Sequence, residues 1–382
     1  MHLALQVIGA VCALLALAGA AYFGLCVWAA RRFRRKRATA GDFAPPVSLL
    51  KSLKGLDPHM YAAFRSHCLQ DYGEYELLLG VSDPKDPALE LVARLQQEFP
   101  QRAVRAVACP TSLGLNGKVS TLAQLLPQAR YEHILINDSD IVAGPDYLRR
   151  VMREFAGDNV GMVTTLYRGL AGKSLPSKLE ALGLSTDFMG GVLVAREMEG
   201  GVRFALGATI ATTKSVLREI GGLEALVDHL GDDYELGART AAAGYRVELS
   251  DAVVETALPD YTWREFWAHQ IRWARNVKDR RRAQYFGLIV TFGLAWGILA
   301  VLAAPWAWWT WAALAVVALF RVSAAVVIGR EVLDDPSVLR DLWLLPPRDF
   351  AALAVWIASF AGDEIEWRGL KFRVRDGKLE QM

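Results

Sequence analysis

The stretch "LINDSD" (residues 135–140) decides the fold prediction, because an apolar segment stops there and acidic residues begin. Asn137 ends the apolar run, and Asp138 and Asp140 then flank one serine. Two carboxylates two residues apart point the same way on an extended backbone, so they repel each other unless a positive charge lies between them. A divalent cation held by oxygen ligands would supply that charge. A polar turn after a strand is the alternative that this short motif leaves open.

Around this motif, residues 47–260 alternate short apolar segments with segments of helical periodicity. The pattern predicts strands at 47–53, 75–82, 103–109, 133–138 and 160–166, and helices at 58–70, 87–99 and 118–129. Such alternation favours a mainly parallel α/β sheet with helices on both faces. Ligands bind at the carboxyl ends of the strands in these sheets, which is where "GVSDPKDP", "GLNGK" and "NDSD" fall.

The N-terminal region predicts a membrane anchor. Residues 3–30 carry no charge, and the basic run "RRFRRKR" follows at 31–37. The apolar stretch is long enough to cross a hydrocarbon core of ~30 Å. A cleaved signal peptide is the competing interpretation, but its basic residues would precede the apolar run. We therefore expect an anchor at 1–30 whose C-terminal side stays in the cytosol, followed by a basic linker at 31–46.

The C-terminal third predicts further membrane segments. Residues 284–330 are apolar with a break at "APWAWWTW", which fits two transmembrane helices joined by an aromatic turn. The segment 331–364 is interrupted by prolines and charges, so it either spans the membrane or lies on it, and the tail 365–382 carries a turn signal at Asp376-Gly377. Basic residues flank the apolar block on both sides. The layout predicts a multi-pass protein of the inner (cytoplasmic) membrane with the α/β domain at 47–260 in the cytosol.

Bulk composition excludes some classes of function. The net charge of the 382 residues is only +2, so the sequence predicts no general attraction to nucleic acid. The four cysteines show no metal-binding spacing and no disulfide framework, which agrees with a reducing compartment.

Three further motifs contain polar residues that suit a functional site. Asp83 and Asp86 follow a predicted strand and suit either a turn or a nucleotide contact, and Lys118 in "GLNGK" precedes a helix, where phosphate oxygens bind readily. "GDDYELG" (231–237) places Asp232, Asp233 and Glu235 in the first turn of a helix, which is more acid than capping requires.

A predicted interfacial helix at 261–283 contains "HQIRW", with His269, Arg272 and Trp273 on one face. An amphipathic helix lying on the membrane explains its tryptophans. An arginine beside an indole ring also suits a diphosphate leaving group in a dry cleft.

Together, "VSLLKSLKGLDP", "VSDPKDPA", "NDSDI", "GDDYELG" and "HQIRW" resemble the ceramide glucosyltransferase family (glycosyltransferase family 21), membrane-bound inverting enzymes with a GT-A fold. The resemblance runs from about Val47 to Trp273, and the stretch "LEALGLSTDFMGGVLVARE" is similar to bacterial members associated with hopanoid synthesis. It implies transfer of N-acetylglucosamine or glucose from a UDP-sugar to a hydroxyl of a lipid acceptor, either a bacteriohopanetetrol-type hopanoid or a ceramide-type lipid.

The resemblance also implies roles for individual residues. Asp86 would contact the nucleotide, Asp138 would bind the metal and diphosphate, and Asp233 would be the general base. His269 departs from the Gln or Arg usual at its position, which leaves that position's role open. The complete predicted set is Asp233, His269, Arg272 and Trp273 for catalysis, Lys54, Asp83, Asp86, Asn116 and Lys118 for donor binding, and Asp138 and Asp140 for Mg²⁺ or Mn²⁺.

Two other functions fit parts of the pattern. A processive polysaccharide synthase shares the aspartates and the Arg-Trp pair but needs a larger membrane bundle. A nonenzymatic membrane adaptor could bind nucleotide sugars without turnover. Residues 188–201, "FMGGVLVAREMEGG", suit either an apolar gate for the lipid or a plain surface loop.

Overall fold

The computed structural model describes residues 2–35, 42–56, 59–367 and 370–381, and the chain divides into two units. The sheet unit comprises Arg37–Leu170, Met198–Pro259 and Gly377–Met382. The membrane-helix unit comprises Met1–Lys36, Ala171–Glu197 and Asp260–Asp376. Both units are therefore built from segments that are distant in the sequence.

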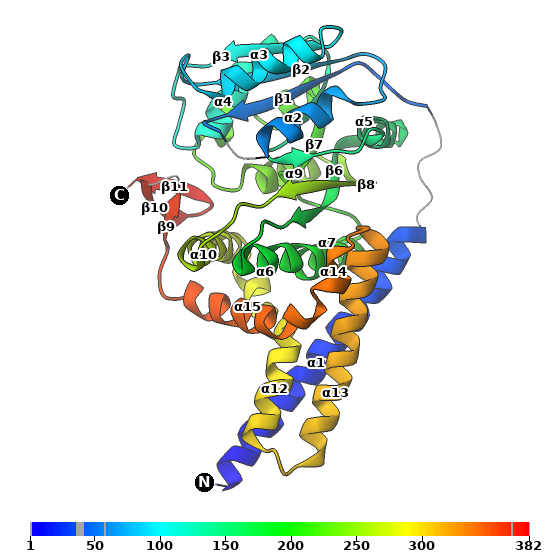
Figure 1. Cartoon of the computed structure of the whole chain (residues 1–382), viewed down its shortest axis with the longest axis vertical. Helices are drawn as coiled ribbons and strands as arrows, with labels where there is room; N and C mark the ends of the chain where they lie inside the picture. The colour runs from blue at the N-terminus through cyan, green and yellow to red at the C-terminus, as the bar shows by residue number, and fades with distance from the viewer. Residues whose placement is uncertain (1, 36–41, 57–58, 368–369, 382) are drawn as a thin grey trace. The chain divides into compact units, whose positions relative to one another are not determined.

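The sheet unit contains an eight-stranded sheet with the strand order β3-β2-β1-β4-β7-β6-β8-β5 (Figure 1). Its strands are β1 (Val47–Leu53), β2 (Tyr75–Val81), β3 (Ala103–Ala108), β4 (His133–Ile136), β5 (Ile141–Val142), β6 (Val160–Leu170), β7 (Ile210–Thr213) and β8 (Arg246–Ala257). Its helices are α2 (Met60–Cys68), α3 (Ala88–Glu98), α4 (Gly117–Leu125), α5 (Tyr147–Met152), α8 (Lys214–Glu219) and α9 (Asp232–Ala242), and β11 (Lys378–Gln381) also belongs to this unit.

The pairing is only partly the parallel arrangement expected from the sequence. Strands β3, β2, β1 and β4 run parallel, as do β6 and β8. Strand β7 pairs antiparallel with both β4 and β6, and β5 pairs antiparallel with β8. These two short strands have no long apolar run, so their pattern did not reveal them. The sheet is therefore mixed, with its parallel half carrying the first four predicted strands.

The membrane-helix unit consists mainly of helices. They are α1 (His2–Arg35), α6 (Leu175–Gly183), the π-helix η3 (Leu184–Phe188), α7 (Met189–Met198), α10 (Trp263–Arg280), α11 (Arg282–Gly287), α12 (Gly293–Ala303), α13 (Trp308–Ala325), the π-helix η6 (Val326–Val332), α14 (Ser337–Arg340) and α15 (Leu345–Ser359). Strands β9 (Glu364–Trp367) and β10 (Leu370–Arg375) pair antiparallel.

Three segments of the described chain are long and apolar enough to cross a membrane: His2–Arg35, Arg282–Ala303 and Trp308–Val332. Helices α1, α12 and α13 lie side by side (Figure 1) and share buried residues such as Ala13, Ala300 and Ala313. A Cβ on Gly19 would lie 2.5 Å from the Cα of Gly293, so these helices pack backbone to backbone.

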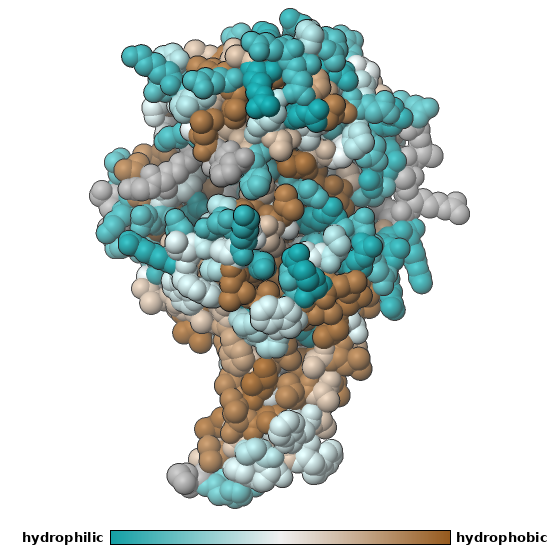
Figure 2. All heavy atoms as spheres, viewed as in Figure 1, coloured by the Kyte–Doolittle hydropathy of each residue, from teal (hydrophilic) through white to brown (hydrophobic). Residues whose placement is uncertain are grey.

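The outer surface of these helices is apolar, as lipid contact requires. Figure 2 shows hydrophobic residues covering α1, α12 and α13. Exposed tryptophans lie in the connection between α12 and α13 and at the start of α13, including Trp306 and Trp308, as the aromatic turn predicted there requires.

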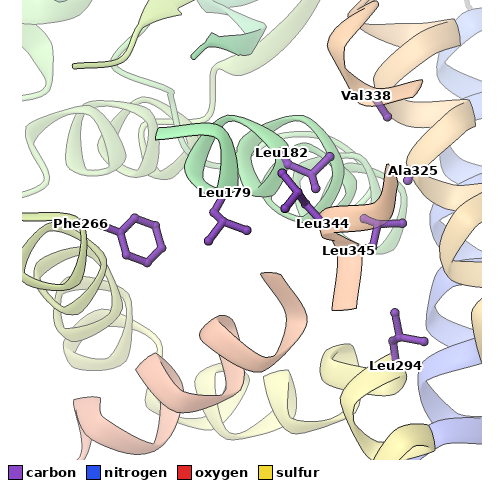
Figure 3. Close-up of a cluster of buried hydrophobic side chains, with 8 residues drawn as sticks. All are labelled: Leu179, Leu182, Phe266, Leu294, Ala325, Val338, Leu344 and Leu345. Atoms are coloured by element: carbon purple, nitrogen blue, oxygen red, sulfur yellow. The ribbon is translucent and has the colours of Figure 1, made fainter. Parts of the chain in front are cut away.

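The third apolar segment forms α15, a helix of 15 residues, which is shorter than the ~20 residues that a membrane-spanning helix needs. Residues of six helical elements (α6, α10, α12, α13, α14, α15) and the short turn before α15 build the apolar core of this unit (Figure 3). The core residues are Leu179, Leu182, Phe266, Leu294, Ala325, Val338, Leu344 and Leu345.

Residues 171–197, which the sequence placed inside the 47–260 domain, belong to the membrane-helix unit as α6, η3 and α7. The stretch considered as a gate or a surface loop is mostly helix α7, so it is not a plain loop, and the gate for the lipid stays a prediction. Leu179 and Leu182 explain the difference, because they are buried in the apolar core of that unit. A positive φ at both Asp376 (49°) and Gly377 (75°) confirms the predicted turn in the tail.

Candidate active site

Four carboxylates and two lysines gather in the sheet unit near the carboxyl end of β4. We call this set the acid cluster, and its members are Lys51, Lys118, Asp138, Asp140, Asp232 and Asp233. They come from β1, the start of α4, the segment after β4 and the start of α9. Lys118, Asp138 and Asp140, which the sequence placed beyond strand ends, thus lie close together, whereas Asp83 and Asp86 are not part of the cluster.

Asp138 and Asp140 lie beyond the end of β4 rather than within a strand. Strand β4 ends at Ile136, and Ser139 and Asp140 form a turn before β5. The two carboxylates therefore have different partners. Asp138 forms an ion pair with Lys118 Nζ at 2.7 Å, and Asp140 accepts a hydrogen bond from Thr256 Oγ1 at 2.5 Å. The polar turn and the functional interpretation of this motif are thus compatible.

The two aspartates of this motif differ in their surroundings. The side chain of Asp138 is 42% exposed. Burial and the neighbouring charge of Asp138 raise the pKa of Asp140. The carboxylate of Asp138 is therefore open to a ligand from solvent, and the partly exposed Asp140 is close enough for the two charges to interact.

Lys51 supplies one of the positive charges. It is fully buried in β1, and its Nζ donates to the backbone carbonyl of Asp138 at 2.9 Å. Burial lowers its pKa to about 7, although the charges of Asp140 and Asp138 act in the opposite direction. The sequence analysis did not select this residue. A lysine in the middle of the apolar strand "VSLLKSL" was the available signal, since an unpaired charge is rarely buried.

Lys118 supplies the other positive charge and connects two acidic segments. Its Nζ lies 2.7 Å from Asp138 Oδ1 and 3.1 Å from Asp232 Oδ2. Burial opposes its charged form, but the carboxylates of Asp138, Asp232 and Asp233 raise its pKa above the ordinary lysine value. The sequence predicted a phosphate contact for this lysine. In the structure it neutralises carboxylates, and the phosphate contact stays a prediction.

Asn116 holds Lys118 in place. Its Oδ1 accepts hydrogen bonds from the backbone of Lys118 and Val119, which caps α4, and its Nδ2 donates to the His229 carbonyl at 2.7 Å. Asn116 is buried, so its role is to position the start of α4.

Asp233 sits at the start of α9 with both oxygens engaged by backbone. Gly207 N donates to its Oδ2 at 2.9 Å and Tyr234 N to its Oδ1 at 2.7 Å. Burial and the charge of Asp232 raise the pKa of Asp233 to about 6, and Lys118 acts against that rise. A carboxylate with a pKa near neutrality is a better proton acceptor than an ordinary aspartate.

Gly207 was not predicted, and nothing in its local sequence marks it. A Cβ at this position would lie 2.8 Å from Asp138 Oδ2 and 3.3 Å from Asp233 Oδ2. Both carboxylates therefore border the same glycine, which brings the predicted metal-binding and base residues together.

The remaining donor-binding candidates lie elsewhere in the sheet unit. Asp86 is buried and accepts hydrogen bonds from the backbone of Gly55 and Ala88, both at 2.9 Å. Asp83 accepts from the backbone of Lys85 at 2.8 Å, and Lys54 is exposed. These contacts give both aspartates a structural role in turns, and the nucleotide contact predicted for Asp86 stays a prediction.

The "HQIRW" residues lie in the membrane-helix unit, on α10. The helix begins with a capping box between Thr262 and Glu265. His269 Nδ1 lies 3.0 Å from Glu180 Oε1, and the His269 ring is 5.2 Å from the half-exposed Trp273 ring. The predicted common face is thus confirmed for these two rings, and Arg272 is partly buried on the same helix.

Comparison with known proteins gives the family of this chain. The sequence pattern described as "Glycosyl transferase family 21" matches residues 11–380. The chain belongs to that family. It is therefore a hexosyltransferase, and the nonenzymatic adaptor considered above is not retained.

Two relatives show what this family 21 chain is similar to. Ceramide glucosyltransferase 1 of Caenorhabditis elegans is 23% identical over 348 residues, which cover 87% of this chain and 72% of that protein. The poly-β-1,6-N-acetyl-D-glucosamine synthase of Staphylococcus aureus is 22% identical over 176 residues, covering 46% of this chain and 42% of that protein.

A solved structure shares the fold. It is the mannosyltransferase PcManGT from Pyrobaculum calidifontis in complex with GDP-Man and Mn²⁺, with a TM-score of 0.56, 22% identity, and coverage of 94% of this chain and 98% of that chain. The family 21 chain thus has a GT-A-like α/β domain, with one N-terminal and two C-terminal apolar helices.

The acid cluster of this family 21 chain suits a hard divalent cation if water and substrate phosphates complete the coordination shell of that cation. Within the described residues, no group of three or more His, Cys, Asp or Glu side chains is arranged to hold a metal ion. Mg²⁺ in nucleotide-dependent enzymes takes one or two carboxylates and completes its shell with water and substrate phosphates. Asp138 and Asp140 supply such oxygens, so the site suits a cation that arrives with a diphosphate.

Proposed function

We propose that this family 21 enzyme transfers N-acetylglucosamine or glucose from a UDP-sugar to a hydroxyl group of a membrane lipid, with inversion at the anomeric carbon. The observation that carries the proposal is the acid cluster, in which four carboxylates face only two lysines. The excess of negative charge suits a divalent cation with its diphosphate, and the raised pKa of Asp233 suits proton abstraction.

In the proposed reaction, Asp233 accepts the proton of the acceptor hydroxyl while the hydroxyl oxygen of the acceptor bonds to the anomeric carbon. The bond between that carbon and the β-phosphate oxygen breaks, and the diphosphate leaves. Asp138 and Asp140 would hold Mg²⁺ or Mn²⁺, which would supply charge stabilisation to the departing diphosphate. Lys118 holds the carboxylate of Asp138 in position through their ion pair. Arg272 and Trp273 are proposed to contact the diphosphate leaving group.

The proposed acceptor is a hopanoid- or ceramide-type lipid, because the relative that covers most of this chain is named a ceramide glucosyltransferase and the chain has three candidate membrane helices. The proposed location is the inner membrane with the acid cluster on the cytosolic side, since basic runs flank the apolar segments there.

The test is a reconstituted assay. Full-length protein in lipid nanodiscs receives UDP-glucose or UDP-N-acetylglucosamine with a ceramide or a polyhydroxylated hopanoid, and mass spectrometry identifies the lipid product. We expect one added hexose, loss of turnover in EDTA, and recovery with Mg²⁺ or Mn²⁺. A ladder of hexose polymers would instead identify a processive synthase, and full activity in EDTA would remove the cation from the proposal.

A pair of variants links this assay to the acid cluster. Asp138→Asn should abolish most turnover while the protein still folds. Asp146→Asn is the matched control, since Asp146 is an exposed aspartate that pairs with Arg150 at 3.5 Å, outside the cluster. Equal turnover in both variants would mean that Asp138 is not part of the site.

A further inference from the structure

A basic cleft of about 390 Å³ lies in the membrane-helix unit, outside the acid cluster. It is bordered by α10, the start of α11, the end of α15 and β10. The residues that matter for its chemistry are Arg275, Lys278, Arg282 and Arg375, together with Phe286 and Phe360. Its volume falls within the range of small-molecule sites, ~300–1,000 Å³.

The positive charge of the basic cleft exceeds its negative charge. Its lining holds four cationic side chains but only two carboxylates, those of Asp279 and Asp363. Asp363 also lies 3.4 Å from Arg373, outside the lining, so it is shared with another cation. The lining therefore carries a net charge of about +2, which favours an anion.

Two of these cations are held by neutral groups. Lys278 Nζ donates to the carbonyls of Ser359 and Gly362, and Arg275 donates to the carbonyl of Glu364. Carbonyl oxygens fix the direction of these side chains without cancelling their charge. Burial, with the nearby Arg275 charge, lowers the pKa of Lys278, as a site with surplus positive charge would produce.

Apolar rings complete the cleft. Phe286 and Phe360 stack at 5.1 Å and are 59% and 40% exposed, and Lys278 Nζ lies 5.5 Å from the Phe360 ring centre. Arg282 and Phe286 belong to the first turns of the candidate span Arg282–Ala303. The cleft thus lies where a membrane helix begins, and its exposed rings suit the boundary between headgroups and acyl chains.

We propose that the basic cleft binds the phosphodiester headgroup of an anionic phospholipid from the surrounding bilayer. The cations face the phosphate, and Phe286 and Phe360 contact the first carbons of the chains. A soluble phosphate would satisfy the charges but would leave the exposed faces of Phe286 and Phe360 in contact with water. A lipid accounts for both the charges and the exposed rings. The ligand differs in chemistry from the neutral polyol or ceramide proposed as acceptor, so its binding is measured without turnover.

The test measures lipid binding to the full-length protein. Detergent-purified protein is titrated with phosphatidylglycerol or phosphatidylcholine, and native mass spectrometry counts bound lipid. We expect one preferentially bound phosphatidylglycerol. The double variant Arg282→Gln/Arg375→Gln should bind it about 30-fold more weakly, since each basic residue near an anionic surface is worth ~1 kcal/mol.

The matched control is Arg264→Gln/Lys371→Gln, which removes two exposed positive charges that do not line the cleft. Equal weakening by the control would overturn the proposal, because general attraction to a basic protein would then explain the binding. Equal affinity for the two lipids would overturn it as well. Displacement of the lipid by millimolar inorganic phosphate would identify a site for free phosphate rather than for a lipid.

Discussion

Two clusters of charged side chains in this enzyme differ in the balance of their charges. The acid cluster of the sheet unit has four carboxylates and two lysines. The ion cluster of the membrane-helix unit has two arginines and two aspartates: Arg321 pairs with Asp187 at 2.5 Å and Asp349 at 2.9 Å, and Arg348 lies 3.3 Å from Asp187. The carboxylates of the acid cluster outnumber its lysines, whereas the positive and negative charges of the ion cluster are equal in number.

The difference indicates what each cluster does. Buried ions in a balanced set stabilise one another and fix which helices meet, here η3, α13 and α15. Where carboxylates outnumber the neighbouring cations, the repulsion between them lowers the stability of the fold. Such groups concentrate at functional sites. Substitutions should therefore reduce turnover in the acid cluster and stability in the ion cluster.

The largest effect is expected for Asp233→Asn. The amide keeps the shape of the side chain but cannot accept the acceptor's proton, so kcat should fall ~10²–10⁴-fold with little change in donor affinity. Turnover with saturating acceptor and calorimetry of UDP-sugar binding measure the two quantities. Glu235→Gln is the control in the same helical turn, where Glu235 lies 3.5 Å from Arg239. Normal turnover of Asp233→Asn would assign the base to another carboxylate.

Arg321→Gln tests the balanced cluster. Arg321 is 1% exposed, so its loss leaves Asp187 and Asp349 without their main partner, and the free energy of unfolding should fall by ~3–5 kcal/mol. The unfolding midpoint in detergent measures this. Arg330→Gln, at an exposed pair with Asp334, should cost less than ~1 kcal/mol. A variant that keeps its stability but loses turnover would place Arg321 in the active site.

Gly207→Ala distinguishes positioning from charge in the acid cluster. The new methyl group would stand 2.8 Å from Asp138 Oδ2, so the carboxylate must move while every charge is retained. A displacement of this kind can reduce kcat/KM by ~10²-fold. Gly73→Ala is the control, because a Cβ there meets no atom within 4 Å. Unchanged kinetics would show that Asp138 and Asp233 tolerate displacement.

The smallest effect concerns pH. Asp233 accepts a proton only when ionised, so kcat/KM should rise with pH on a limb centred near pH 6, where its pKa lies in the free enzyme. Lys118 lowers that pKa, so Lys118→Met should move the limb to higher pH. Rate profiles from pH 5 to 8 in a constant-ionic-strength buffer test both statements. A limb that stays in place, or moves to lower pH, would contradict the assignment.

The sequence revealed much of the fold because most strands and helices of the sheet unit carry regular apolar patterns. The strands at 47–53 and 75–81 and the acidic turn at Asp232-Asp233 needed only local information. The ion pair of Lys118 with Asp138 and the proximity of Gly207 to two carboxylates depend on contacts between distant segments. The sequence placed residues 171–197 in the 47–260 domain rather than with the membrane helices for the same reason, since an apolar helix face does not show which elements pack against it.

The pairing of Asp187 with Arg321 has a consequence for the synthesis of the chain. The two residues are separated by 134 positions. At ~5–20 residues per second, roughly ten seconds pass between the emergence of Asp187 and that of its partner. During that interval α6, η3 and α7 have the Asp187 carboxylate and buried apolar side chains without their final contacts. Chains interrupted before α13 should therefore be targets for chaperones and proteases, and the catalytic region should not be obtainable as a stable fragment that retains residues 171–197 but lacks the membrane helices.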